Sequence, residues 1–140
     1  MKLAIDTSVW VSHFGRADEF TEESKLFFAK LVDQKQQLIL PTMVLAETVT
    51  ILVRQRHSDL NKIYQNLMQA ECVGLDLEFM QKYIDQIKVL NTQLKTSDLI
   101  IAVTAKLAEA VLVTWDKQLL KETKDICEVT TPREFLSKSW

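Results

Sequence analysis

Four carboxylates occupy positions from which a folded chain could bring them together. Asp6 ends an apolar run, Asp116 follows another, Asp98 opens an apolar helical segment, and Glu47 lies on the apolar face of a helical pattern. Clustered carboxylates without a nearby histidine or cysteine suit hard divalent cations such as Mg²⁺ or Mn²⁺. A hydrated divalent ion lowers the pKa of a bound water and neutralises a phosphate during in-line displacement. If the four side chains converge, their types favour metal-dependent phosphoryl chemistry.

Other kinds of catalytic or cofactor site are excluded by composition. The chain has only two glycines, so neither the dinucleotide fingerprint nor the Walker phosphate loop can be present. The two cysteines, Cys72 and Cys127, lie too far apart in sequence to form a zinc or iron-sulfur motif by themselves. His13 and His57 do not have metalloprotease spacing. Any chemistry must therefore use oxygen ligands.

Length and patterning set the class of protein. With 140 residues, 47% of them hydrophobic and 26% charged, the chain is expected to form one globular domain over residues 1–140. Asp6 interrupts the first apolar run too early for a signal peptide, and no apolar stretch reaches the roughly 20 residues that a membrane-spanning helix needs. The expectation is a cytoplasmic protein that does not associate with membranes.

Short apolar runs alternate with helical patterns along the chain. The runs lack the polar alternation of half-exposed strands, so they are interpreted as strands buried on both faces, as in parallel sheets. They are Leu3-Ala4-Ile5, Leu38-Ile39-Leu40, Val73-Gly74-Leu75 and Val111-Leu112-Val113, with a weaker fifth strand from Cys127 to Thr130. The alternation predicts a three-layer α/β domain in which a four- to five-stranded parallel sheet is flanked by helices.

Helical periodicity fills the intervals between these runs. Three apolar stripes are expected: Phe27, Phe28, Leu31 and Val32; Leu60, Ile63, Tyr64, Leu67 and Met68; and Leu77, Met80, Ile84 and Ile87. Asp76 is a candidate N-cap for the third stripe, and Thr131 to Glu134 forms a capping box with proline at the first helical position. The segment Leu99–Ala108 is apolar nearly all round. It is expected to be the most buried helix, with Lys106 and Glu109 at its solvent edge.

The predicted fold gives a reason for the acids to meet. In an open parallel sheet, ligands bind beyond the carboxyl ends of the strands, where Asp6 and Asp116 are expected. Asp98 begins a helix that should start near the same edge, and Glu47 shares a helix face with Val44 and Ile51. Taken singly, each acid has an ordinary explanation, because aspartates often cap helices and helical glutamates are usually solvated.

Four motifs together resemble those of the PIN-domain family, most closely the VapC-type ribonuclease toxins. The resemblance covers essentially the whole chain, in order and spacing. The motifs are Asp6-Thr7-Ser8, Pro41 to Thr48 with Leu45-Ala46-Glu47, Ser97-Asp98 before an alanine-bearing helix, and Leu112-Val113-Thr114-x-Asp116. The resemblance implies a PIN-like fold and an endoribonuclease that uses one or two Mg²⁺ or Mn²⁺ ions. It maps the acidic site onto Asp6, Glu47, Asp98 and Asp116, with support from the hydroxyls of Thr7, Ser8 and Thr114.

Three further residues were considered for contact with RNA. Trp115 departs from the family pattern, which often has a polar or basic residue there, and it could stack on a nucleobase or pack at an edge or dimer surface. Arg54 and Arg56 could touch backbone phosphates or complement a helix dipole. The chain has 17 basic and 19 acidic residues, so removing the four site acids leaves 17 against 15, a balance of +2 that does not oppose RNA binding.

The toxin resemblance also implies partners. They are an RNA substrate, a cognate small antitoxin protein and a second copy of the chain in a homodimer. The main alternative is a catalytically silent PIN-like module that binds RNA or protein. A phospho-receiver domain is disfavoured because Val129-Thr130-Thr131, after the fifth expected strand, supplies no lysine. The sequence does not say which RNA is cleaved.

Overall fold

A five-stranded parallel sheet forms the centre of the computed structural model, which describes residues 1–138. Its strand order is β3-β2-β1-β4-β5, and every neighbouring pair is parallel. The strands are β1 (Lys2–Ile5), β2 (Gln37–Pro41), β3 (Glu71–Val73), β4 (Val111–Val113) and β5 (Val129–Thr130). The predicted α/β class and the parallel sheet, including its fifth strand, are confirmed.

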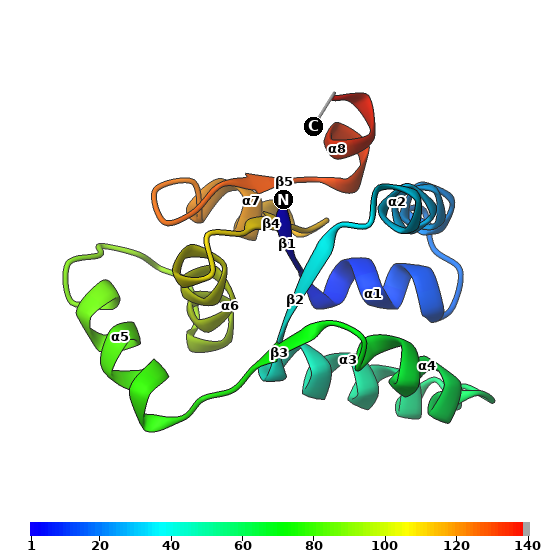
Figure 1. The fold of residues 1–140 in the computed structure, drawn as a ribbon, viewed down its shortest axis with the longest axis horizontal. Helices are drawn as coiled ribbons and strands as arrows, with labels where there is room; N and C mark the ends of the chain where they lie inside the picture. The colour runs from blue at the N-terminus through cyan, green and yellow to red at the C-terminus, as the bar shows by residue number, and fades with distance from the viewer. Residues whose placement is uncertain (139–140) are drawn as a thin grey trace.

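Helices flank the sheet in the three layers expected. The helices are α1 (Thr7–Phe14), α2 (Thr21–Gln34), α3 (Thr42–Arg54), α4 (Leu60–Leu67), α5 (Leu77–Ile87), α6 (Thr96–Leu107), α7 (Lys117–Glu122) and α8 (Pro132–Ser137). Helices α1, α2 and α4 lie on one side of the sheet, and α5 and α6 lie on the other (Figure 1). The strand order reverses after β3, so a crevice opens between the carboxyl ends of β1 and β4.

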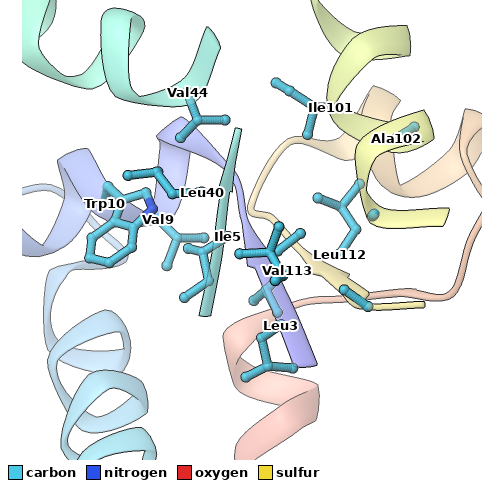
Figure 2. Packing of buried hydrophobic residues seen from close by; sticks show 14 of the residues in the cluster. Leu3, Ile5, Val9, Trp10, Leu40, Val44, Ile101, Ala102, Leu112 and Val113 are labelled. Carbon is cyan, nitrogen blue, oxygen red and sulfur yellow. The ribbon is translucent and has the colours of Figure 1, made fainter. Parts of the chain in front are cut away.

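The core lies where β1 and β4 contact the surrounding helices. Leu3, Ile5 and Val113 are fully buried, and Figure 2 shows Ile5 beside Val9 of α1 and Leu112 pointing toward α6. All residues from Ile100 to Ala105 are buried, whereas Lys106 and Glu109 are exposed. The apolar helix is therefore in its predicted place against the sheet. This packing fixes the start of α6, and with it Asp98, at the edge of the crevice.

The third strand differs from the prediction in both position and burial. It comprises Glu71–Val73 instead of residues 73–75, and Gly74 and Leu75 lie in the exposed segment that follows. As an edge strand that pairs only with β2, β3 leaves its first two residues exposed. The expectation of a strand buried on both faces was wrong here, because that burial comes from helices that cover both faces of a sheet, and the cover is incomplete at this edge.

Helix α5 is rotated relative to the predicted stripe. Met80 and Ile87 pack against the core as expected, whereas Leu77 is 89% exposed and Ile84 is 49% exposed. Phe79 and Tyr83, one turn apart, are buried in their place, and each brings a large aromatic ring to the interface. Val32, Tyr64 and Met68, at the edges of the other two stripes, are exposed as well.

Two predicted helix caps are confirmed. Asp76 accepts a 2.8 Å hydrogen bond from the Phe79 N–H at the start of α5, and Thr131 accepts a 3.0 Å bond from the Glu134 N–H at the start of α8. Among residues 1–138, no helix has the length and apolar character needed to cross a bilayer.

Candidate active site

A pocket of about 420 Å³ opens at the carboxyl ends of β1 and β4, in the crevice that the strand order creates. Five acids line its wall. Four of them are those predicted from the sequence, Asp6, Glu47, Asp98 and Asp116, and the fifth is Asp18. Because the four predicted acids come from the end of β1, from α3, from α6 and from the start of α7, their convergence is a property of the tertiary fold.

Asp6 is held by hydroxyl groups. Its buried carboxylate accepts 2.8 Å hydrogen bonds at Oδ2 from Ser8 Oγ and from Thr114 Oγ1, and a longer 3.4 Å bond from the Ser8 N–H. The Ser8 hydroxyl also accepts a 3.0 Å bond from the Trp115 N–H. None of these donors bonds Oδ1. The network fixes the carboxylate while using only one of its two oxygens.

Asp116 combines a helix cap with a place in the pocket. Its Oδ1 accepts bonds of 2.9 and 3.0 Å from the backbone N–H groups of Gln118 and Leu119, at the start of α7. Its own N–H donates a 3.0 Å bond to Thr114 Oγ1. The capping interpretation is therefore correct, and the same side chain still lines the pocket beside Asp6. The two roles are compatible because the cap uses one oxygen.

Glu47 enters the pocket from α3 and bonds to the first turn of α1. Thr7 Oγ1 donates a 3.2 Å hydrogen bond to Glu47 Oε1. Burial raises the pKa of Glu47, the Thr7 bond opposes that rise, and the negative charges of Asp6 and Asp98 add to it, while Lys95 opposes it. The raised pKa indicates that the ionised form of this glutamate is disfavoured when no cation is present.

Asp98 lies in the first turn of α6 and is half-buried. Burial raises its pKa, and Lys95 partly offsets that effect. The charges of Asp6, Asp116 and Glu122 raise it further. Two of the four acids thus hold protons more readily than free carboxyl groups, as expected where like charges share a pocket.

The donor set fits a hard divalent cation that keeps much of its hydration shell. All four acids offer oxygen, the ligand that Mg²⁺ and Mn²⁺ prefer. Within residues 1–138, no three Asp, Glu, His or Cys side chains are grouped closely enough to form a ready-made metal site. Magnesium is usually held by only one or two carboxylates, with water and phosphate oxygens as its remaining ligands. A pocket with carboxylates on its wall is consistent with that kind of binding.

Five further residues line the pocket, and no sequence pattern had indicated them for the site. They are Val11, Asp18, Phe20, Ile51 and Lys95. Lys95 could have been noticed, because it directly precedes the motif that carries Asp98. Ile51 had been placed on the Glu47 face, although without a part in the site. Asp18 and Phe20 belong to the connection between α1 and α2, where no periodicity indicates which way a side chain points.

Trp115 packs inside the subunit, with 8% of its surface exposed. Its ring stacks on Phe20 with a centroid separation of 4.4 Å and an interplanar angle of 13°. Its indole N–H donates a 2.9 Å hydrogen bond to Ser24 Oγ in α2. The burial of Trp115 behind Phe20 and α2 leaves little of its ring available for a base or for a dimer surface.

The two arginines considered for RNA contact differ in position. Arg54 lines a hollow of about 340 Å³ that shares Glu47 and Ile51 with the acidic pocket. Arg56 is exposed beyond the end of α3, with a left-handed backbone at φ 54°. Arg54 is therefore next to the pocket, whereas Arg56 lies farther along the same surface segment.

Comparisons with known proteins agree with this architecture. The family model described as the PIN domain matches residues 3–125. A toxin-antitoxin complex from Klebsiella pneumoniae has a similar fold, with 20% identity, a TM-score of 0.68, and coverage of 93% of this chain and 97% of that chain. VapBC2 from Rickettsia felis, bound to a DNA fragment from its promoter, gives 18% identity, a TM-score of 0.63, and coverage of 94% and 98%.

A third similar structure is Mycobacterium tuberculosis VapC20, described as a sarcin-ricin loop cleaving toxin. It gives 14% identity, a TM-score of 0.60, and coverage of 84% of this chain and 92% of that chain. Curated protein sequences give no match. At these identities the solved structures establish the fold alone, whereas the family model spans most of the chain. This chain belongs to the PIN-domain family.

Proposed function

We propose that this protein is an Mg²⁺- or Mn²⁺-dependent endoribonuclease that hydrolyses RNA phosphodiester bonds, and that it is the toxin of a toxin-antitoxin pair. The observation that carries the proposal is the convergence of Asp6, Glu47, Asp98 and Asp116 on one pocket. PIN domains are typically nucleases and usually use divalent metals, which supports the assignment. The similar Mycobacterium tuberculosis protein is described as a toxin that cleaves an RNA loop.

The proposal assigns a role to each acid. Asp6 and Asp98 would hold one divalent ion directly, Glu47 would hold a second ion or orient a water molecule, and Asp116 would contribute directly or through water. A bound divalent ion supplies positive charge to the phosphate and lowers the pKa of water. Ser8 and Thr114 hold the Asp6 carboxylate in position, and Thr7 does the same for Glu47.

The toxin assignment implies a small antitoxin as a partner, and a second cleft offers it a surface. This cleft has a volume of about 750 Å³ and is lined by Trp10, His13, Phe14 and Phe28, among others. Among the described residues, the buried Trp10 Nε1 and His13 Nδ1 atoms have no hydrogen-bond partner, which is costly unless a ligand or water supplies one. Residues of α1 line both this cleft and the acidic pocket, so a segment bound along α1 would lie close to both.

The decisive experiment is a cleavage assay on single-stranded RNA with Mg²⁺ or Mn²⁺ and with EDTA. We expect cleavage only with metal, and we expect Asp6→Asn and Asp98→Asn to abolish it while circular dichroism stays unchanged. Asp33→Asn, at an exposed position on α2, is the matched control and should cleave normally. If the wild type binds RNA without cutting it, the silent binding module is correct and the nuclease assignment is wrong.

The partner assignments need their own measurements. Co-expression with the product of a small neighbouring reading frame should give a stable complex and block cleavage. Sedimentation equilibrium should give twice the chain mass if the protein forms the expected homodimer. Growth that is unaffected by overexpression of an active nuclease would contradict the toxin role while leaving the enzyme assignment intact.

A further inference from the structure

We propose that Phe20 is a stacking platform for an unpaired nucleobase of the RNA that enters the acidic pocket. The inference rests on the proposed ribonuclease function and adds a base-binding surface to it. Phe20 precedes α2 and lines the same pocket as the four acids. Its side chain is half-buried, so part of it remains accessible from the pocket.

The aromatic ring of Phe20 is backed by a second aromatic ring. Phe20 and Trp115 lie nearly parallel, with centroids 4.4 Å apart and an interplanar angle of 13°. Trp115 is buried, whereas Phe20 is the more exposed member of the pair. A base that stacks on Phe20 would extend this two-ring stack into the pocket. Base stacking, which the sequence suggested for Trp115, is therefore assigned to Phe20.

A chain of hydrogen bonds, buried at Trp115 and Ser24 and reaching the surface at Asp18, connects to this platform. The Trp115 indole donates to Ser24 Oγ at 2.9 Å, Ser24 donates to Ser12 Oγ at 3.1 Å, and Ser12 donates to Asp18 Oδ1 at 3.0 Å. Asp18 Oδ1 also accepts a 2.8 Å bond from the Phe20 N–H. The backbone of Phe20 and the ring behind it are thus tied to one network. A surface ordered in advance loses little conformational entropy when a ligand stacks on it.

The chemistry of the wall favours a base over other groups. The lining combines the apolar side chains of Val11, Phe20 and Trp115 with carboxylates, among them Asp6 and Asp98. A nucleotide matches this combination, because its phosphate would go with the cation at the carboxylates and its base with the aromatic ring. Stacking on a ring requires an unpaired base and tolerates any sequence, since every base has a π face.

The test combines protein variants with altered RNA. A pool of short single-stranded RNAs of random sequence first identifies a cleaved RNA. Versions of that RNA with an abasic ribose at each position near the cleaved bond are then compared. We expect Phe20→Leu to raise KM about 5- to 150-fold with little change in kcat, the loss expected for one base stacked equally in the ground and transition states. An abasic ribose at one position should have the same effect on the wild type and almost none on Phe20→Leu.

Rescue and control variants separate stacking from misfolding. Phe20→Tyr and Phe20→Trp keep an aromatic face and should restore the wild-type KM. Tyr64→Leu removes an aromatic ring that lies on α4 and is 48% exposed, and it should leave KM unchanged. The inference is overturned if Phe20→Leu keeps both the wild-type KM and the wild-type sensitivity to abasic positions. A wild type that cleaves no RNA in the pool overturns the proposed function and this inference with it.

Discussion

The Thr114 hydroxyl donates a 2.8 Å hydrogen bond to the Asp6 carboxylate, across 108 positions of the chain. The same oxygen accepts a 3.0 Å bond from the Asp116 N–H. This contact follows from strand pairing, because Ile5 lies in register with Val113 and the next residues of β1 and β4 are therefore neighbours. One buried hydroxyl thus sets the relative position of two of the four acids.

Replacing that hydroxyl should weaken both stability and activity. Thr114→Val keeps the shape but leaves the Asp116 N–H without its acceptor and removes one donor from Asp6. We expect the free energy of unfolding to fall by about 1–3 kcal/mol. We expect cleavage to fall about 10- to 100-fold, the usual effect of losing a group that orients a metal ligand. Urea unfolding and initial cleavage rates measure the two effects.

Two variants make this prediction specific. Thr114→Ser retains the hydroxyl and should recover most of the activity. Thr104→Val removes another buried hydroxyl, which donates only to the Ile100 carbonyl within α6, so it should not affect cleavage beyond any loss of stability. Equal activity in Thr114→Val and the wild type would show that Asp6 does not depend on this bond for its function.

Asp98→Asn should stabilise the metal-free protein at neutral pH. Burial and neighbouring carboxylates raise the pKa of Asp98, so the native state binds its proton more tightly than the unfolded state. Stability therefore falls as pH rises above the ordinary carboxyl range and through the raised pKa. Asparagine removes that dependence. We expect a gain of about 0.2–1 kcal/mol at pH 7 in EDTA, in the range of charge interactions between partly exposed groups.

The pH and metal dependence of this gain distinguishes it from a general packing effect. In urea unfolding curves, the gain should disappear below the ordinary pKa of an aspartate, where Asp98 is protonated in both states. At neutral pH, Mg²⁺ should stabilise the wild type more than the variant, because a ligand that binds the native state more tightly raises its stability more. A gain that persists at low pH would rule out charge repulsion as its cause.

Local patterns were sufficient to predict the parallel sheet and to place Asp6 and Asp116 at its carboxyl edge, whereas the grouping of all four acids came from the resemblance to the PIN-domain family. Apolar runs of three residues marked β1 and β4, and the residues after them lie at the sheet edge in any parallel fold. The shift of β3 and the rotation of α5 depend on tertiary contacts. Leu77 continues an aliphatic stripe in the sequence, but the competing pair Phe79 and Tyr83 occupies the interface with the rest of the fold.

Helix and strand patterns in the sequence do not predict the part of the pocket that comes from the connection between α1 and α2. Asp18 and Phe20 lie in the connection between α1 and α2, and their positions depend on Ser12, Ser24 and Trp115. None of these hydrogen bonds follows from a periodic pattern or a motif. The sequence therefore predicted four of the five acids that line the pocket and missed Asp18 and Phe20.

Trp115→Phe should destabilise the fold by loss of a single hydrogen bond. Phenylalanine can keep a ring against Phe20 but cannot donate to the buried Ser24 hydroxyl. We expect a loss of about 1–3 kcal/mol in the free energy of unfolding, measured with urea. In a double-mutant cycle with Ser24→Ala, the two losses should be less than additive, because each substitution removes the same bond. Additive losses would show that the indole N–H contributes little.

Metal affinity should fall as the pH is lowered, and Lys95 should set where this happens. The pKa values of Glu47 and Asp98 are both raised, and each must lose its proton to bind a cation. Apparent Mn²⁺ affinity, measured by calorimetry, should therefore decrease already above the ordinary carboxyl range. Lys95 lowers both pKa values, so Lys95→Met should move the decrease to higher pH.

The same substitution should raise the affinity itself once both acids are ionised. Lys95 lines the pocket, and its positive charge repels a bound cation. At pH 8, Lys95→Met should therefore bind Mn²⁺ more tightly than the wild type. The affinity curves of the two proteins should therefore converge as the pH is lowered, because the cation then replaces two protons and the charge beside Lys95 hardly changes. Lys124→Met, at an exposed position outside the lining of the acidic pocket, is the matched control and should follow the wild type at every pH. Curves that stay parallel would mean that Lys95 acts on the cation alone and does not control the protonation of Glu47 and Asp98.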